Sequence, residues 1–224
     1  MLPLFPLGSV LFPGLVLPLH VFEERYRQLV RDLLELPEEQ REFGVVAIRE
    51  GREVDADGVA ALFPVGCTAR VRRVEPYDDG RYDVLTVGAR LFRVATLHRP
   101  PGQPPGYLTA DVEWLPDEVG DPAEAAVLDA SVRTAYAGYL AALGKATAQE
   151  VEVPELPDEP LVLSHLVAAT MLLDLGDRQD LLEQPDGRTR LRRELSLLRR
   201  EAAFLAVLTA APAPELARTP YSPN

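Results

Sequence analysis

The apolar positions at the start of the chain follow two successive patterns. Residues 2–19 read LPLFPLGSVLFPGLVLPL, an apolar stretch interrupted by prolines and glycines. Prolines this frequent rule out a continuous helix, because each one removes a backbone donor and clashes with the preceding turn. From Phe22 to Leu36 the apolar residues recur every three or four positions, which predicts an amphipathic helix that ends before Pro37. Short extended segments therefore lead into one helix.

The middle of the chain carries the pattern of a β-sheet. Residues 43–48 form a short apolar run rich in β-branched residues, which is typical of a strand buried on both faces. Apolar and polar residues alternate on both sides of Asp79-Gly80, which predicts a hairpin. Gly88 predicts a bulge or bend in the returning strand, and residues 107–115 predict the last strand. Loops are expected at residues 51–58 and 100–106.

From residue 121 onward the apolar residues follow a helical period. Asp121-Pro122 is a suitable start, since proline is favoured at the first helical position. Residues 161–175 are apolar on nearly all sides, which predicts a buried helix that ends at Gly176. Asp177 is expected to cap a short helix through Gln184. A last amphipathic helix follows, with its apolar stripe at Leu191, Leu195, Leu198, Ala202, Leu205 and Leu208.

Several of these segments resemble the amino-terminal substrate-binding domain family of Lon proteases. The resemblance covers roughly residues 1–210, and two of its motifs lie far apart in the expected order. The resembling stretches are LPLFPL at 2–7, VLFPG at 10–14, PL at 18–19, VGCTARV at 65–71, DG at 79–80, GARLFRV at 88–94 and DRQDLLE at 177–183.

The resemblance implies an α+β fold. Residues 1–118 are expected to form a twisted, mostly antiparallel β-sheet or partial barrel of the PUA-like type, with one helix. Residues 119–210 are expected to form an α-helical bundle, and residues 211–224, with four prolines, a disordered tail. The resemblance further implies a stand-alone bacterial member without the ATPase and protease modules.

Composition narrows the classes of partner. The formal net charge of −12 argues against nucleic acid and anionic membranes, because both attract cationic surfaces. Cys67 is the single cysteine, which excludes an intramolecular disulfide and fits a cytoplasmic protein. The apolar start lacks a basic region before it, and its prolines prevent a spanning helix.

The residues that could carry catalysis lack the required spacing. Gly144-Lys145 is followed by Ala146, so it does not form a phosphate-binding loop. Lys145, the one lysine, has no surroundings that resemble the Lon Ser-Lys dyad. His20, His98 and His165 have no metal-ligand spacing. We expect no catalytic, cofactor-binding or metal-binding residue and hence no enzyme.

Three residues and one charged segment have ordinary structural interpretations. His165 lies within the apolar helix, and Cys67 lies on the apolar face of its strand, so both are predicted to be buried. His20 precedes the first helix and could support its start. The arginines between residues 188 and 200 are predicted to form a solvated helix face.

The resulting prediction is a non-catalytic polypeptide-binding protein, similar in role to the Lon substrate-binding domain. The predicted binding residues lie on the polar face of the first helix: Glu23, Glu24, Arg27, Gln28 and Arg31. Two alternatives remain, a scaffold or regulator of one folded partner and an uncharacterised enzyme. The predicted core includes Phe12, Phe22, Val46, Phe92, Leu195 and Leu205.

Overall fold

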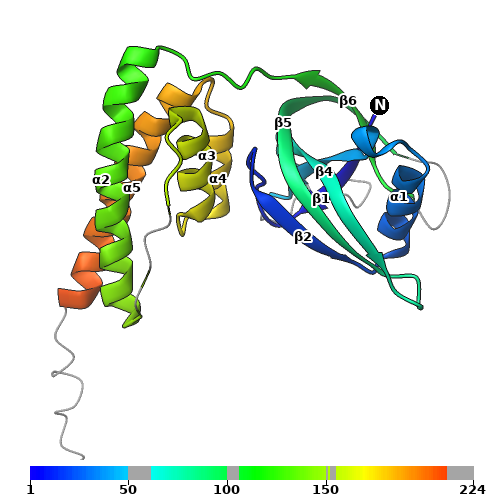
Figure 1. Ribbon diagram of the computed structural model, residues 1–224, viewed down its shortest axis with the longest axis horizontal. Coiled ribbons are helices and arrows are strands. Elements are labelled where there is room, and N and C mark those ends of the chain that lie inside the picture. Colours follow the sequence, from blue (N-terminus) through cyan, green and yellow to red (C-terminus); the bar gives the residue numbers. More distant parts are fainter. Residues whose placement is uncertain (50–61, 100–105, 150, 152–154, 211–224) are drawn as a thin grey trace, which may run out of the picture.

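The computed structural model describes residues 1–49, 62–99, 106–149, 151 and 155–210. The predicted loop at 51–58, most of that at 100–106 and the predicted tail at 211–224 lie outside this part. The described chain forms two lobes (Figure 1). The sheet lobe contains β1 (Leu2–Leu7), β2 (Val16–Val21), α1 (Glu24–Leu34), η1 (Glu38–Gln40), β3 (Glu42–Ala47), β4 (Val65–Pro76), β5 (Tyr82–His98) and β6 (Thr109–Trp114). The helical lobe contains α2 (Pro122–Thr147), α3 (Pro160–Thr170), α4 (Leu175–Leu182) and α5 (Gly187–Ala210). The predicted α+β class is confirmed.

The strands form one six-stranded sheet in the order β2-β5-β4-β3-β1-β6. β1 and β3 pair in parallel, and the other pairs are antiparallel. β6 pairs with β1 and also with the second half of the long strand β5, so the sheet curls back toward itself. This arrangement is the predicted twisted, mostly antiparallel sheet or partial barrel.

Gly88 in β5 marks a close backbone approach. The pairing of β4 with β5 shifts register beside it, between Cys67 and Ala69, which confirms the predicted bulge. The Gly88 amide donates to the carbonyl of Leu15 at 2.8 Å, and its carbonyl accepts from the Gly14 amide at 2.9 Å. A Cβ atom at position 88 would lie 2.1 Å from the carbonyl oxygen of Phe12. Glycine therefore lets the proline-glycine turn before β2 dock against β5.

Successive residues of the strands enter two different hydrophobic clusters. Phe5, Val45 and Leu91 face the larger cluster, which includes the buried side of α1. Their neighbours in sequence face the smaller cluster, because side chains alternate across a strand. The smaller cluster consists of Leu4, Val46, Phe92 and Ala110 with partly buried residues around it.

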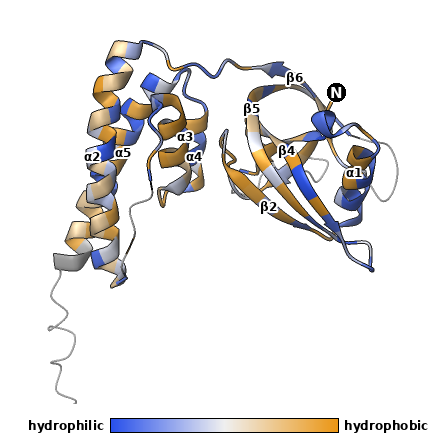
Figure 2. Cartoon of the chain, viewed as in Figure 1, coloured by the Kyte–Doolittle hydropathy of each residue, from blue (hydrophilic) through white to orange (hydrophobic). Residues whose placement is uncertain are grey.

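The helical lobe has α2 and α5 lying side by side, with α3 and α4 on the side that faces the sheet lobe (Figure 1). Asp121 caps α2, since its Oδ1 accepts from the amides of Ala123 and Glu124. α3 is coloured hydrophobic over most of its length in Figure 2 and is the predicted buried helix. It ends at Thr170, earlier than predicted.

The predicted cap at Asp177 is wrong. The backbone becomes extended at Met171, with φ −65° and ψ 140°, so the chain leaves the helical path before Gly176. Asp174 then caps α4 by accepting from the amide of Asp177 at 2.8 Å. Gly176 and Asp177 consequently lie in the first turn of α4.

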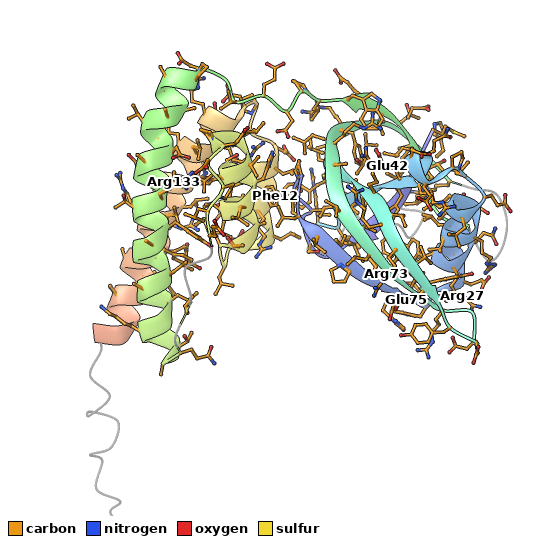
Figure 3. The ribbon with its side chains drawn as sticks, viewed as in Figure 1. Phe12, Arg27, Glu42, Arg73, Glu75 and Arg133 are labelled. Carbon is orange, nitrogen blue, oxygen red and sulfur yellow. The ribbon has the colours of Figure 1, made fainter. Side chains whose placement is uncertain are left out.

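The two lobes share one continuous hydrophobic cluster. Phe12, which precedes β2, lies between the lobes (Figure 3), and its ring centroid is 6.4 Å from that of His165 in α3. Gln179 of α4 donates to the buried carbonyl of Val65 in β4 at 3.0 Å. These contacts connect the two sides of the domain boundary predicted near residue 118. Whether the two lobes are separate domains stays a prediction.

The predicted core is confirmed in part. Phe12, Val46 and Phe92 are at most 1% exposed. Leu195 and Leu205 are partly buried and pack against the main cluster. The prediction that Phe22 is a core residue is wrong, since its side chain is 63% exposed. α1 begins at Glu24, so Phe22 precedes the helix whose buried face it was expected to join. Within the described residues no helix is long and apolar enough to cross a membrane.

Candidate polypeptide-binding surface

The predicted binding residues of α1 form ion pairs and hydrogen bonds with their own helix. Glu24 pairs with Arg27 at 3.1 Å and with Arg31 at 2.5 Å. Arg31 also donates to the side-chain oxygen of Gln28 at 3.0 Å. Glu23 pairs with Arg25 at 2.8 Å. Every one of the five predicted side chains thus has a partner on α1 or at its cap.

Arg27 connects α1 to the hairpin between β4 and β5 (Figure 3). Its Nε donates to the carbonyl of Gly80 at 2.7 Å, and its Nη2 donates to the carbonyl of Asp79 at 3.2 Å. Gly80 has a φ of 81°, the conformation that the predicted hairpin turn requires. Arg27 therefore positions the hairpin against α1, a role that the helical pattern alone did not predict.

An open hollow of about 650 Å³ lies at the other end of α1. We call it the α1 hollow. None of the five predicted residues lines it. Its walls come from α1 and the residues after it, β1, β3, β5 and β6, and they comprise Met1, Leu2, Pro3, Leu33, Leu36, Glu39, Gln40, Glu42, Arg90, Ala110, Asp111, Val112 and Trp114. A volume of this size is typical of ligand sites in proteins.

Apolar side chains remain accessible in the α1 hollow. Trp114 is 45% exposed and Leu36 is 39% exposed, although large apolar residues usually enter the core. The Trp114 and Phe92 rings pack edge to face, with their planes at 77° and their centroids 6.4 Å apart. The guanidinium of Arg90 lies 3.7 Å from the Trp114 ring centroid. The indole is thus held in place while part of it stays open to solvent.

Glu42 holds Arg90 over that indole. Its Oε1 accepts from Arg90 Nη2 at 2.9 Å and from Arg90 Nε at 3.3 Å, and its Oε2 lies 3.5 Å from Arg70. Burial acts to raise the pKa of Glu42, but hydrogen bonds from Arg90 and Thr68 and the nearby positive charges outweigh it and hold that pKa below its ordinary value. Glu42 is therefore ionised at neutral pH.

A second hollow, of about 400 Å³, lies over the outer face of β2, β5 and β4. Its polar side chains pair with one another: His20 Nδ1 lies 2.7 Å from Asp83, and Arg73 lies 3.0 Å from Glu75. His20 belongs to β2 and its side chain bonds to Asp83 of β5. The expectation that it supports the start of α1 is therefore wrong. The exposed ring of Phe22 lies beside it, with centroids 6.4 Å apart.

Two buried titratable side chains, those of Cys67 and His165, are explained by their packing. Cys67 is fully buried and burial raises the pKa of its thiol, so it remains protonated, as expected for a core residue. Burial also lowers the pKa of His165, which is 3% exposed and bonds to Asp117 at 3.0 Å. Among the described residues, no group of three or more His, Cys, Asp and Glu side chains could hold a metal ion.

The arginines of α5 were predicted to form a solvated helix face, and Arg190 is an exception because it is buried. Arg190 is 1% exposed, and it donates to the Leu181 carbonyl and to Ser164 Oγ, both at 3.0 Å. The prediction missed it because its neighbours on the buried side come from α3 and α4. Arg193 pairs with Asp180, and Arg200 pairs with Asp177, as on a solvated helix face.

Comparison with known proteins assigns this architecture. A sequence model described as the ATP-dependent protease La (LON) substrate-binding domain matches residues 1–200. The Lon protease of Anaeromyxobacter dehalogenans is 30% identical over 206 residues, which are 91% of this chain and 24% of that protein. The Escherichia coli K12 Lon protease is 28% identical over 92% of this chain and 25% of its own length. The chain thus spans about a quarter of the length of these relatives.

Two solved structures agree. The Lon N-terminal domain protein from Xanthomonas campestris is 28% identical, with a TM-score of 0.57 over 87% of this chain and 96% of that one. The N-terminal domain of the Mycobacterium avium complex Lon protease, at 18% identity, shows the same fold with a TM-score of 0.61 over 88% of this chain and 97% of that one. From the family match over most of its length, the chain belongs to the Lon substrate-binding domain family.

Proposed function

We propose that this chain is a non-catalytic recognition module that binds polypeptide segments in the α1 hollow. The observation that carries the proposal is the exposed apolar surface around Trp114 and Leu36, within a hollow of about 650 Å³. Membership of a substrate-binding domain family supports polypeptide as the ligand. We therefore place the proposed binding site in the apolar hollow at the carboxyl end of α1. The sequence had predicted it on the polar face of α1, where the side chains pair with each other.

The geometry favours one or two apolar side chains of an extended segment as the bound group. The hollow is open, and its lining combines an indole with aliphatic residues such as Leu2 and Leu36. Burying such a side chain contributes about 1.5–3 kcal/mol. Ordering a flexible segment costs about 2–5 kcal/mol or more, so one segment binds weakly and several segments of an unfolded chain bind more strongly.

A second candidate is an adaptor that binds one folded partner, and the exposed aromatic residues beside the second hollow favour it. Phe22 is 63% exposed and Tyr77 is 44% exposed. Tyr77 donates to Asp83 at 2.6 Å, and Asp83 also bonds to His20, so hydrogen bonds hold the Tyr77 side chain against β5 and β2. Exposed aromatic residues are frequent anchors of protein interfaces. For either candidate, the net charge of −12 supports a protein partner over nucleic acid and anionic membranes, and the cytoplasm is the proposed location.

Trp114 offers a direct test, because it is the single tryptophan of the chain. A reduced, alkylated model polypeptide without tryptophan should shift or quench its fluorescence in a saturable titration. Leu36→Asp places a charge in the lining of the hollow and should weaken this binding. Val127→Asp is the matched control, since Val127 is 69% exposed on α2 in the helical lobe, and it should leave binding unchanged.

The outcome separates the two candidates. Saturable binding that weakens only with Leu36→Asp supports the α1 hollow. Binding that is unaffected by Leu36→Asp and lost with Phe22→Ala would reject the hollow and favour the adaptor. A chain that binds no unfolded polypeptide at all would reject the proposed function.

A further inference from the structure

We propose that polypeptide binds in the α1 hollow as an added β-strand, paired with the open edge of β6. This inference rests on the proposed function and specifies its substrate, an extended segment that binds through its backbone. It is carried by the unequal reach of two neighbouring strands. β1 begins beside β6 (Figure 1), where Leu2 pairs with Ala110, and β6 continues beyond that pair to Trp114.

Beyond Ala110, β6 has a strand neighbour on one side only. Residues 111–114 pair with β5. Within the described part of the chain, no strand pairs with them on the side of β1. The position next to them, in line with β1, is therefore open, and it lies in the α1 hollow. An unpaired strand edge presents backbone donors and acceptors that another chain can pair with.

Hydrogen bonds on both sides of β6 show which of its residues face this open position. In an antiparallel sheet, successive residues of a strand bond alternately to the neighbour on one side and on the other. The Leu4 amide donates to the Leu108 carbonyl at 2.8 Å, so the even-numbered residues of β6 face β1. The Leu115 amide donates to the Leu91 carbonyl at 3.0 Å, so the odd-numbered residues face β5. The two observations agree.

Val112 and Trp114 therefore direct their backbone N–H and C=O groups into the hollow. Glu113 between them pairs with Arg93 of β5 and is not available to a ligand. An extended segment in the open position bonds to both free residues. In strand addition of this kind the backbone supplies affinity without requiring a particular side chain, which suits a module that binds unfolded chains of different sequence.

Apolar side chains flank the open position on both of its faces. Leu2 and Val112 pack against the smaller hydrophobic cluster, and Leu33 of α1 belongs to the larger one. All three line the hollow. Because side chains alternate across a strand, successive residues of a bound segment meet these two groups in turn. Segments with consecutive apolar residues, typical of strands buried on both faces, therefore fit better than segments in which apolar and charged residues alternate.

Amide hydrogen exchange of the full chain, followed by NMR, tests strand addition residue by residue. The probe is a short tryptophan-free peptide with consecutive valine and isoleucine residues between polar ends. In the free protein the amides of Val112 and Trp114 should exchange rapidly, and that of Glu113 slowly. With the peptide at about ten times its Kd, exchange at Val112 and Trp114 should slow by about tenfold, since only the free fraction exchanges.

Two proline variants test the same assignment from the protein. Val112→Pro removes the donor that faces the ligand and no bond within the sheet, because proline is tolerated where an edge N–H points outward. It should leave Tm close to wild type and weaken peptide binding about 3- to 10-fold, the value of one hydrogen bond. Glu113→Pro removes a bond to β5 and should lower Tm. Val112→Ala is the matched control for binding, since it trims the side chain but keeps the N–H, and it should weaken binding less than Val112→Pro.

Each other outcome overturns a defined part of the account. Slow exchange of Val112 and Trp114 in the free chain, or a Val112→Pro variant as unstable as Glu113→Pro, would reject the open edge. A peptide that changes Trp114 fluorescence without slowing exchange at these amides, or equal weakening by Val112→Pro and Val112→Ala, would reject strand addition while the proposed function stands. If neither the peptide nor an unfolded polypeptide changed Trp114 fluorescence or amide exchange, the proposed function itself would be rejected.

Discussion

Phe12 provides the sharpest test of how the two lobes depend on each other. It is 1% exposed and lies between the lobes, next to the ring of His165 (Figure 3). Phe12→Ala removes a buried aromatic ring at this junction, a change that typically costs about 3–5 kcal/mol of unfolding free energy. For a chain of this length each kcal/mol lowers Tm by about 2–4 °C. We therefore expect Tm to fall by roughly 6–20 °C.

Two spectroscopic probes follow the two lobes separately. Fluorescence of Trp114 in β6 reports the sheet lobe. Far-UV circular dichroism reports mainly the helical lobe, which contains the long helices α2 and α5. In the wild-type chain both probes should show one transition, because one hydrophobic cluster extends through both lobes. Phe12→Ala should lower both midpoints.

The control is Phe204→Ala, since Phe204 is 59% exposed on α5 and such substitutions usually change stability by about 0.5 kcal/mol or less. Two separate transitions in the wild-type chain would refute the reasoning. So would a Phe12→Ala variant whose Tm equals that of Phe204→Ala. Either result would mean that the boundary near residue 118 divides two independent domains.

Three further predictions concern single residues of the sheet lobe. Arg27→Met should lower the unfolding free energy by about 1–3 kcal/mol in urea denaturation, because two backbone carbonyls of the hairpin lose their donor; an unchanged midpoint would make this contact energetically neutral. Gly88→Ala should fail to fold or unfold at much lower temperature, since the new Cβ would meet the Phe12 carbonyl at 2.1 Å, whereas Gly138→Ala, with open space around it, should be at least as stable as wild type. The lowered pKa of Glu42 contributes stability that is present above its unfolded pKa and is lost as pH falls through the folded value. Glu42→Gln should therefore lose less stability than wild type between pH 7 and about pH 3 in urea titrations, and identical pH slopes would contradict this.

Local patterns were sufficient to predict the elements that local chemistry determines. Asp79-Gly80 forms the predicted turn because glycine there has a positive φ. Asp121 caps α2 because its carboxylate lies next to the first free amides. The apolar run at residues 43–48 predicted a buried strand, and Val46 in it and Phe92 in β5 are both fully buried, as expected for core positions.

The errors arise where tertiary packing decides. Phe22 fits the helical period of α1, yet the helix begins two residues later and leaves its ring in solvent. Arg190 looks like a surface arginine, but α3 and α4 cover it and accept its hydrogen bonds. The α1 hollow could not be predicted for the same reason. Its lining residues come from separate segments, and Trp114 and Leu36 line the same hollow only because the fold brings β6 near the end of α1.

Chemical-shift mapping of the full chain with an unfolded, tryptophan-free polypeptide tests the central claim most directly. The account predicts that the perturbed amides, and the Trp114 indole N–H, cluster around Leu36, Ala110 and Val112, and that Leu36→Asp abolishes these shifts. Perturbations confined to α5 around Arg192 and Arg199, or to Phe22 and Tyr77, or an unchanged spectrum at saturating polypeptide, would contradict it.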